Sequence, residues 1–313
     1  MRTILKRVAL DHLAPGGNTP YARGAMAKLT FIGLGVMGAP MARHLAAVGH
    51  DLTVYNRNPA KAEAWVAVHG GRQAASVAAA VAGAEAVFTC VGNDDDLTEV
   101  VLGAGGALAA MAPGALLVDH TTVSADLARR LAVVGAARGM HVVDAPVSGG
   151  QAGAELGALS IMCGGSAAAV AAASPLMAVY AKRIVHVGPA GAGQQTKMVN
   201  QIAIAGVLAG LAEALRFAQA SELDLAKVYE AISGGAAQSW QMDNRWATMA
   251  DDGFDFGFAI DWMRKDLGLA LDEARARGAV LPVTALVDQF YAEVQRLGGG
   301  RQDTSALVRR LPK

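Results

Sequence analysis

Short apolar runs alternate with amphipathic stretches along the first 190 residues of the chain. Each run is bounded by glycine, proline or polar residues, which is typical of buried strands. Strands alternating with helices predict an α/β fold with a doubly wound parallel sheet. The predicted strands are 28–33, 51–56, 86–92, 115–120, 141–147, 157–165 and 183–188, and helical patterns occupy 39–49, 59–70, 94–102, 124–139 and 167–173.

The pattern changes after Gly188, where GPAGAGQQ predicts a glycine-rich hinge. An all-α part follows, with helical patterns at 197–222, 225–233, 261–278, 282–298 and 304–311. The long helix, which starts near Gln194, is apolar on nearly every face, so we expect it to be buried in its own domain or against a partner subunit. The predicted domains are a nucleotide-type domain at 28–189 and a helical substrate and dimerisation domain at 190–313.

Residues 1–27 have scattered basic residues, no periodicity and no apolar stretch of the secretory type. We expect a disordered extension, or a start codon assigned too early with Met26 as the natural beginning.

The charge balance excludes some partners. The chain has 27 Lys plus Arg and 27 Asp plus Glu in 313 residues, so no overall basic field attracts nucleic acid or an anionic membrane. The apolar run Ile202–Ala212 is shorter than the roughly 20 residues of a membrane helix.

Cys90 and Cys163 are far apart and no metal motif is present, which favours a reducing, cytoplasmic setting without a metal.

The stretch FIGLGVMGAPMARHL carries a G-x-G-x-x-G frame after a strand and at the start of a helix. Such a frame binds the pyrophosphate of a dinucleotide at the helix N-terminus, although a plain strand-to-helix turn has the same spacing. A second strand ending about 20 residues later favours the Rossmann-type site. The predicted cofactor loop comprises Gly33, Leu34, Gly35, Val36, Met37 and Gly38.

The end of the second predicted strand bears on the choice of dinucleotide. NAD sites usually carry an acid there to hold the ribose hydroxyls, but this chain has Asn56 and Arg57. Arg57 can bind a 2′-phosphate, so the sequence favours NADP, with NAD possible. The alternative is that Arg57 is an ordinary surface arginine.

Two further stretches carry candidate chemistry. DAPVSGG ends a strand, and Ser148, Gly149 and Gly150 can bind a substrate carboxylate there, or form a loop without a ligand. In KMVNQ, Lys197 and Asn200 share a helix face. A desolvated lysine is a good general acid or base, whereas a lysine at a helix start can also simply extend to solvent.

WMRKDLGLA places Lys265 and Asp266 among apolar residues of a helix, as a site pair or a surface ion pair. Together with DHTT, GALSIMCGG and GAGQQTKMVNQ, these stretches resemble the β-hydroxyacid dehydrogenase family, in the family's order over about 28–310. Its members include 3-hydroxyisobutyrate dehydrogenase and the tartronate, glyoxylate and succinic semialdehyde reductases. The resemblance implies a small carboxylate substrate. The apolar long helix favours a homodimer or homotetramer, although the core of a monomer would show the same pattern.

The resemblance also assigns roles. Lys197 looks like the catalytic lysine and Asn200 like its substrate-holding neighbour. Lys265 resembles the lysine that closes over nicotinamide and substrate, with Asp266 supporting it. The serine-glycine loop resembles the carboxylate site, and the remaining cofactor contacts are Val91, Gly92 and Thr122.

The sequence also departs from the family. Gly92 replaces the usual proline, which leaves its loop freer, and the nearby run Asp94–Asp96 is expected to be a solvated helix start. We predict NADPH-dependent reduction of a semialdehyde to a β-hydroxyacid, with Lys197 as general acid. The alternatives are an NAD-dependent 3-hydroxyisobutyrate-type dehydrogenase and a dinucleotide-binding sensor without catalysis.

Overall fold

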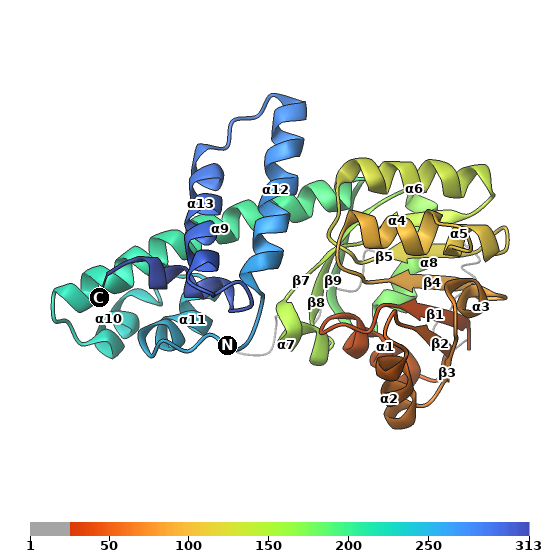
Figure 1. Cartoon of the computed structure of the whole chain (residues 1–313), viewed down its shortest axis with the longest axis horizontal. Coiled ribbons are helices and arrows are strands. Elements are labelled where there is room, and N and C mark those ends of the chain that lie inside the picture. Colours follow the sequence, from red (N-terminus) through yellow and green to blue (C-terminus); the bar gives the residue numbers. More distant parts are fainter. Residues whose placement is uncertain (1–25, 313) are drawn as a thin grey trace, which may run out of the picture.

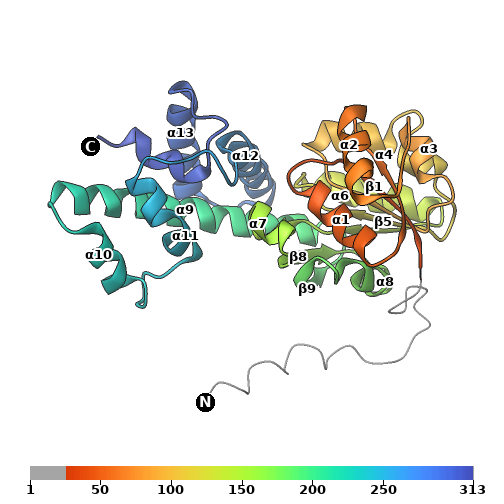
Figure 2. The same ribbon diagram turned by 90° about the horizontal axis from the view of Figure 1, so that it is seen from below.

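The computed structural model describes residues 26–312 and has two parts along its longest axis (Figure 1). A sheet domain occupies one end and a group of helices the other, and the turned view in Figure 2 shows the same separation. Residues 1–25, on which the expectation of an extension or early start depends, lie outside the described residues. The fold confirms the predicted Rossmann-type domain followed by an all-α part.

Within residues 26–312 the sheet contains nine strands, in the order β3-β2-β1-β4-β5-β6-β8-β7, with β9 also paired to β8. The strands from β3 to β6 are parallel, which confirms the predicted doubly wound parallel sheet, and β8 adds an antiparallel pairing to β6 and β7. Only the short helix α7, Gly150–Glu155, separates β7 from β8, and a parallel crossover needs a dozen or more residues. The strands are β1 Lys28–Ile32, β2 Asp51–Tyr55, β3 Arg72–Gln73, β4 Ala86–Thr89, β5 Leu116–Asp119, β6 His141–Asp144, β7 Val147–Ser148, β8 Leu159–Gly164 and β9 Ala181–Gly188.

Helices cover both faces of the sheet, which explains why the central strands read as continuous apolar runs. Phe31 and Phe88 pack with α1, α2 and α8 on one face, whereas Ile32 and Val87 pack with α3 to α6 on the other. The helices of this domain are α1 Gly38–Ala47, α2 Pro59–His69, α3 Val77–Val81, α4 Asp94–Leu102, α5 Ala107–Ala110, α6 Ala125–Ala137, α7 Gly150–Glu155 and α8 Ala167–Met177.

The all-α part is built around one long helix, α9, which leaves the sheet domain and runs through the centre of the helical group (Figure 1). Its buried side packs against α11, α12, α13 and the 3-10 helix η1. The helices of this part are α9 Ala192–Ala220, α10 Leu225–Ile232, α11 Trp240–Ala250, α12 Ile260–Arg277, α13 Pro282–Arg296 and η1 Thr304–Arg310.

The predicted glycine-rich hinge is partly helical. Helix α9 already begins at Ala192, because the Asp144 carboxylate accepts hydrogen bonds from the Gly191 N–H at 2.8 Å and the Gln194 N–H at 3.0 Å. A carboxylate at this position satisfies free amides and complements the helix dipole. The connection between the two parts is therefore fixed to the end of β6.

Helix α9 is the one helix within residues 26–312 that is long and apolar enough to cross a membrane by length and composition. The sequence prediction considered only its uninterrupted apolar run and so missed this. Its contacts are those of a core helix, because its first three turns bury Gln194, Lys197 and Gln201 against the rest of the protein.

Candidate active site

The glycine loop between β1 and α1 has the geometry that a dinucleotide requires. Gly33 has φ +97° and donates a hydrogen bond to the Tyr55 carbonyl at 2.9 Å. A β-carbon at Gly38 would overlap the Gly33 carbonyl oxygen, so helix and strand approach closely there. A β-carbon at Gly35 would meet nothing within 4 Å, which leaves backbone open to a phosphate. The loop fits a bound pyrophosphate.

The end of β2 supports this loop from one side. The Asn56 Oδ1 accepts a hydrogen bond from the Leu34 N–H at 3.0 Å, so its carboxamide holds the glycine loop in place. Arg57 is 80% exposed and pairs with Asp96 at 2.8 Å. The predicted phosphate-binding arginine is thus already engaged by a carboxylate of α4.

The loops after β4 and β5 support the glycine loop from the other side. A β-carbon at Gly33 would lie 3.1 Å from a Val91 methyl group, and the Val91 N–H donates to the Thr121 hydroxyl at 3.1 Å. Asp94 accepts hydrogen bonds from Ser124, including its hydroxyl at 2.5 Å. The expected helix start at Asp94–Asp96 is confirmed, but only Asp95 is exposed. Asp94 and Asp96 are half-buried, and Asp96 pairs with Arg57.

Lys197 lies in the second turn of α9 with only 9% of its surface exposed. Among the described residues, no carboxylate lies within ion-pairing distance of its amine. Burial lowers the pKa of Lys197, the Asp266 charge raises it in part, and the Lys265 charge lowers it further. A buried amine without a partner, held near two opposite charges, has the character of a general acid or base.

A continuous set of polar contacts joins the serine loop to the cofactor side. The Ser148 hydroxyl donates to Asn200 Oδ1 at 3.4 Å, and the Asn200 amide donates to Gln201 Oε1 at 2.8 Å. Gln201 in turn donates to Asp266 Oδ2 at 2.7 Å. The structure therefore brings the residues predicted on β7 and on α9 into one constellation.

The same set continues through α12 to the sheet domain. Asp266 Oδ1 lies 3.0 Å from the Lys265 amine, which also donates a short hydrogen bond to the Thr122 carbonyl oxygen. Thr122 contributes its backbone to this contact. Lys265, which is partly buried, and Asp266, which is buried, consequently link the domains and are not a surface ion pair.

The serine loop has a backbone that needs glycine. Gly149 has φ +133° and Gly150 has φ +63°, both in the region that side chains disfavour, and both residues are exposed. Their amides are open to a small anion beside Ser148.

Sequence reasoning missed three residues that build the site. Gln194 is fully buried and joins the Thr121 and Val123 backbones, but nothing local distinguishes it from the adjacent Gln195. Asp144 was part of a quoted motif without an assigned role. Trp262 lies beside Gly92 and one turn before Lys265 on α12, so the i, i+3 spacing could have indicated that it shares a helix side with Lys265.

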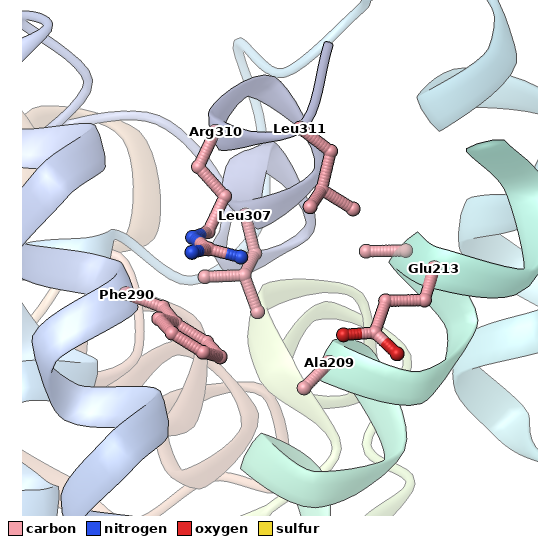
Figure 3. Close-up of a pocket in the computed structure, with 7 residues that line it drawn as sticks. Ala209, Glu213, Phe290, Leu307, Arg310 and Leu311 are labelled. Atoms are coloured by element: carbon pink, nitrogen blue, oxygen red, sulfur yellow. The ribbon is translucent and has the colours of Figure 1, made fainter.

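A separate pocket lies in the helical part, between α9, α13 and η1 (Figure 3). Glu213 and Arg310 line it together with Phe290 and Leu307. Glu213 is 16 residues beyond Lys197 on α9, roughly 24 Å along a helix. This pocket is therefore distinct from the constellation around Lys197.

Two family models match the chain. The NAD binding domain of 6-phosphogluconate dehydrogenase matches residues 28–188, and the NAD-binding domain of NADP-dependent 3-hydroxyisobutyrate dehydrogenase matches residues 191–311. The two matches together span almost all of the described residues.

Three relatives match over most of their length. An uncharacterized oxidoreductase of Shewanella frigidimarina is 60% identical, covering 92% of this chain and 99% of the relative. The 2-(hydroxymethyl)glutarate dehydrogenase of Eubacterium barkeri is 38% identical, covering 90% and 94% respectively. The structure of Mycobacterium tuberculosis 3-hydroxyisobutyrate dehydrogenase with L-serine has a TM-score of 0.84 and 32% identity, covering 92% of this chain and 100% of that one.

Proposed function

The chain belongs to the β-hydroxyacid dehydrogenase family and is an NAD(P)-dependent dehydrogenase that acts on a hydroxyl group. From this premise we propose that it uses NADPH to reduce a small semialdehyde that carries a carboxylate. Lys197 is the proposed general acid. The observation that supports this role is the burial of the Lys197 side chain one helical turn before Asn200, which accepts the Ser148 hydrogen bond.

Each residue of the constellation has a distinct task. The Ser148 hydroxyl and the amides of Gly149 and Gly150 hold the substrate carboxylate, and Asn200 orients the reacting oxygen. Bound nicotinamide supplies the hydride chemistry. Lys197, as an ammonium, donates a proton to the developing alkoxide, and in the oxidative direction the neutral amine takes that proton back.

Holding the reactants in place is the main contribution of the protein. The glycine loop from Gly33 to Gly38 holds the pyrophosphate, while Val91, Gly92 and Thr122 border the cofactor from the neighbouring loops. Lys265 ties α12 to Thr122 and so closes the helical part over the site.

The cofactor preference rests on Arg57, which has no acidic neighbour at the end of β2 itself and can bind a 2′-phosphate. A second candidate is NAD-dependent oxidation of a 3-hydroxyisobutyrate-type hydroxyacid. It is favoured by one observation: the Arg57 guanidinium is already paired with the Asp96 carboxylate, which a 2′-phosphate would have to displace. A panel of semialdehydes and hydroxyacids, assayed with both cofactors at the nicotinamide absorbance band, separates the two. Turnover of semialdehydes with NADPH supports the first candidate, and turnover confined to NAD and hydroxyacids contradicts it.

We further propose that the protein is a homodimer or homotetramer assembled through α9. The outer side of this helix carries an apolar stripe, on which Val199 is 65% exposed and Phe217 is 72% exposed. Contiguous apolar surface of this kind is typical of interaction sites. The stripe comprises Val199, Ala203, Val207, Gly210, Ala214 and Phe217, which recur every three or four residues.

A further inference from the structure

The Arg57–Asp96 ion pair spans the glycine loop. Arg57 follows β2, and Asp96 lies in the first turn of α4, which follows β4. Strand β1, which leads into the glycine loop, lies between β2 and β4 in the sheet. The pair therefore joins the two loops that flank the dinucleotide site, at the end where β2 faces the adenosine ribose.

Gly92 makes room for this pair. A β-carbon at Gly92 would lie 2.5 Å from Asp96 Oδ2 and 3.4 Å from the ring edge of Trp262. The space that a proline or alanine would fill is thus occupied by the Asp96 carboxylate and by a tryptophan from α12. The glycine does not only free its loop, because it allows Asp96 to reach toward Arg57.

We propose that Asp96 competes with the adenosine 2′-phosphate for Arg57, so that Asp96 is a positioning residue that sets the balance between NADP and NAD. Arg57 is 80% exposed, and exposed ion pairs are weak, so a phosphate with more than one negative charge can displace the carboxylate. NAD has no such group and leaves the pair intact. This inference rests on the proposed binding of the adenosine end at Arg57.

The test is direct titration of the full-length protein with NADPH and with NADH, in which nicotinamide fluorescence reports binding. The quantity compared is the ratio of the dissociation constant for NADH to that for NADPH. Asp96→Asn should raise this ratio about 3- to 10-fold, with a smaller increase at high salt. Asp95→Asn is the matched control, because Asp95 is the exposed neighbouring acid with the same charge and should change the ratio less than about 2-fold. Gly92→Ala should shift the ratio in the same direction as Asp96→Asn, since it crowds the carboxylate.

A double variant tests whether Asp96 acts through Arg57. In the Arg57→Ala background, Asp96→Asn should give no gain for NADPH. Each of three results would overturn the proposal. They are an unchanged NADPH preference in Asp96→Asn, an equal rise in NADPH preference in Asp95→Asn, and a full rise when Asp96→Asn is combined with Arg57→Ala. The titration needs no substrate, so failure of the proposed reaction would appear separately, as absent turnover with intact cofactor binding.

Discussion

The Asp266 carboxylate on α12 acts on the Lys197 amine of α9 without forming an ion pair with it. Asp266 is instead held by the Lys265 amine at 3.0 Å and by the Gln201 amide at 2.7 Å. Its charge raises the pKa of Lys197, against burial and the Lys265 charge, which both lower it. Burial therefore has the largest effect on the proton affinity of the proposed general acid, and two opposite charges on one neighbouring helix adjust it.

This arrangement predicts a pair of opposite pH effects. Reduction needs the Lys197 ammonium, so kcat should fall as pH rises through a pKa below the usual lysine value of 10.5. Asp266→Asn removes the stabilising charge and should move that alkaline limb to lower pH, whereas Lys265→Met should move it to higher pH. The measurement is the pH profile of kcat for the three proteins, and limbs that move together would contradict the assignment.

The link between β6 and α9 predicts a stability effect. Asp144→Ala leaves the buried Gly191 and Gln194 amides without an acceptor, at a cost of about 2–4 kcal/mol in the free energy of unfolding. Asp126→Ala is the control, since Asp126 is an exposed acid in the first turn of α6 and should change stability by less than about 0.5 kcal/mol. Urea unfolding measures both, and equal effects would show that the Asp144 contacts do not stabilise the junction.

The buried carboxyl group of Asp119 should make the free energy of unfolding depend on pH. Burial raises the pKa of Asp119 to about 7 from 3.8, with hydrogen bonds from Thr89 and Thr121 acting in the opposite direction and the Asp144 charge adding to the rise. The folded state then binds more protons than the unfolded state between about pH 4 and pH 7. This contribution is present below pH 4 and is lost as pH rises to about 7, by up to about 1.4 kcal/mol per pH unit.

Comparison with Asp119→Asn isolates this contribution. Burial lowers the pKa of the neighbouring His120 to about 4 from 6.5, which gives the opposite slope between about pH 4 and pH 6.5 in both proteins. The difference in unfolding free energy between wild type and variant should fall from pH 4 to pH 7. A difference that is constant with pH would mean that Asp119 is ionised throughout.

The apolar stripe on α9 predicts an effect on assembly. Phe217→Glu places a charge on the stripe and should convert the oligomer to monomer, as measured by sedimentation. Val68→Glu is the control, because Val68 is also an exposed apolar residue, 75% exposed, but lies on α2 of the sheet domain. A wild type that sediments as a monomer would contradict the proposed assembly.

Local patterns in the sequence were sufficient to predict the Rossmann-type sheet, the glycine turn and the long helix. Helix α11 was missed, although Met242, Trp246 and Met249 have helical spacing and are buried, because polar residues surround them. Strand β8 was predicted, but its antiparallel direction was not, since strand direction depends on the short α7 connection and not on the strand residues.

The sequence was sufficient to name the residues of the proposed site, but not the contacts between them. The family resemblance identified Ser148, Lys197 and Lys265, while the bridging role of Gln201 depends on helix packing across 65 positions of the chain. The Arg57–Asp96 pair joins residues 39 positions apart on two loops. Neither contact has a local signal, because each is determined by how the strands are ordered and the helices packed.

The most direct test of the account is the Lys197→Ala variant, assayed for turnover and for NADPH binding. Loss of the proton donor should lower kcat by about 10²–10⁴-fold while the dissociation constant for NADPH stays nearly unchanged. Lys182→Ala, at an exposed lysine of β9, is the control and should keep full turnover. A Lys197→Ala protein that binds NADPH and retains most of its turnover would contradict the assignment of Lys197 as the general acid.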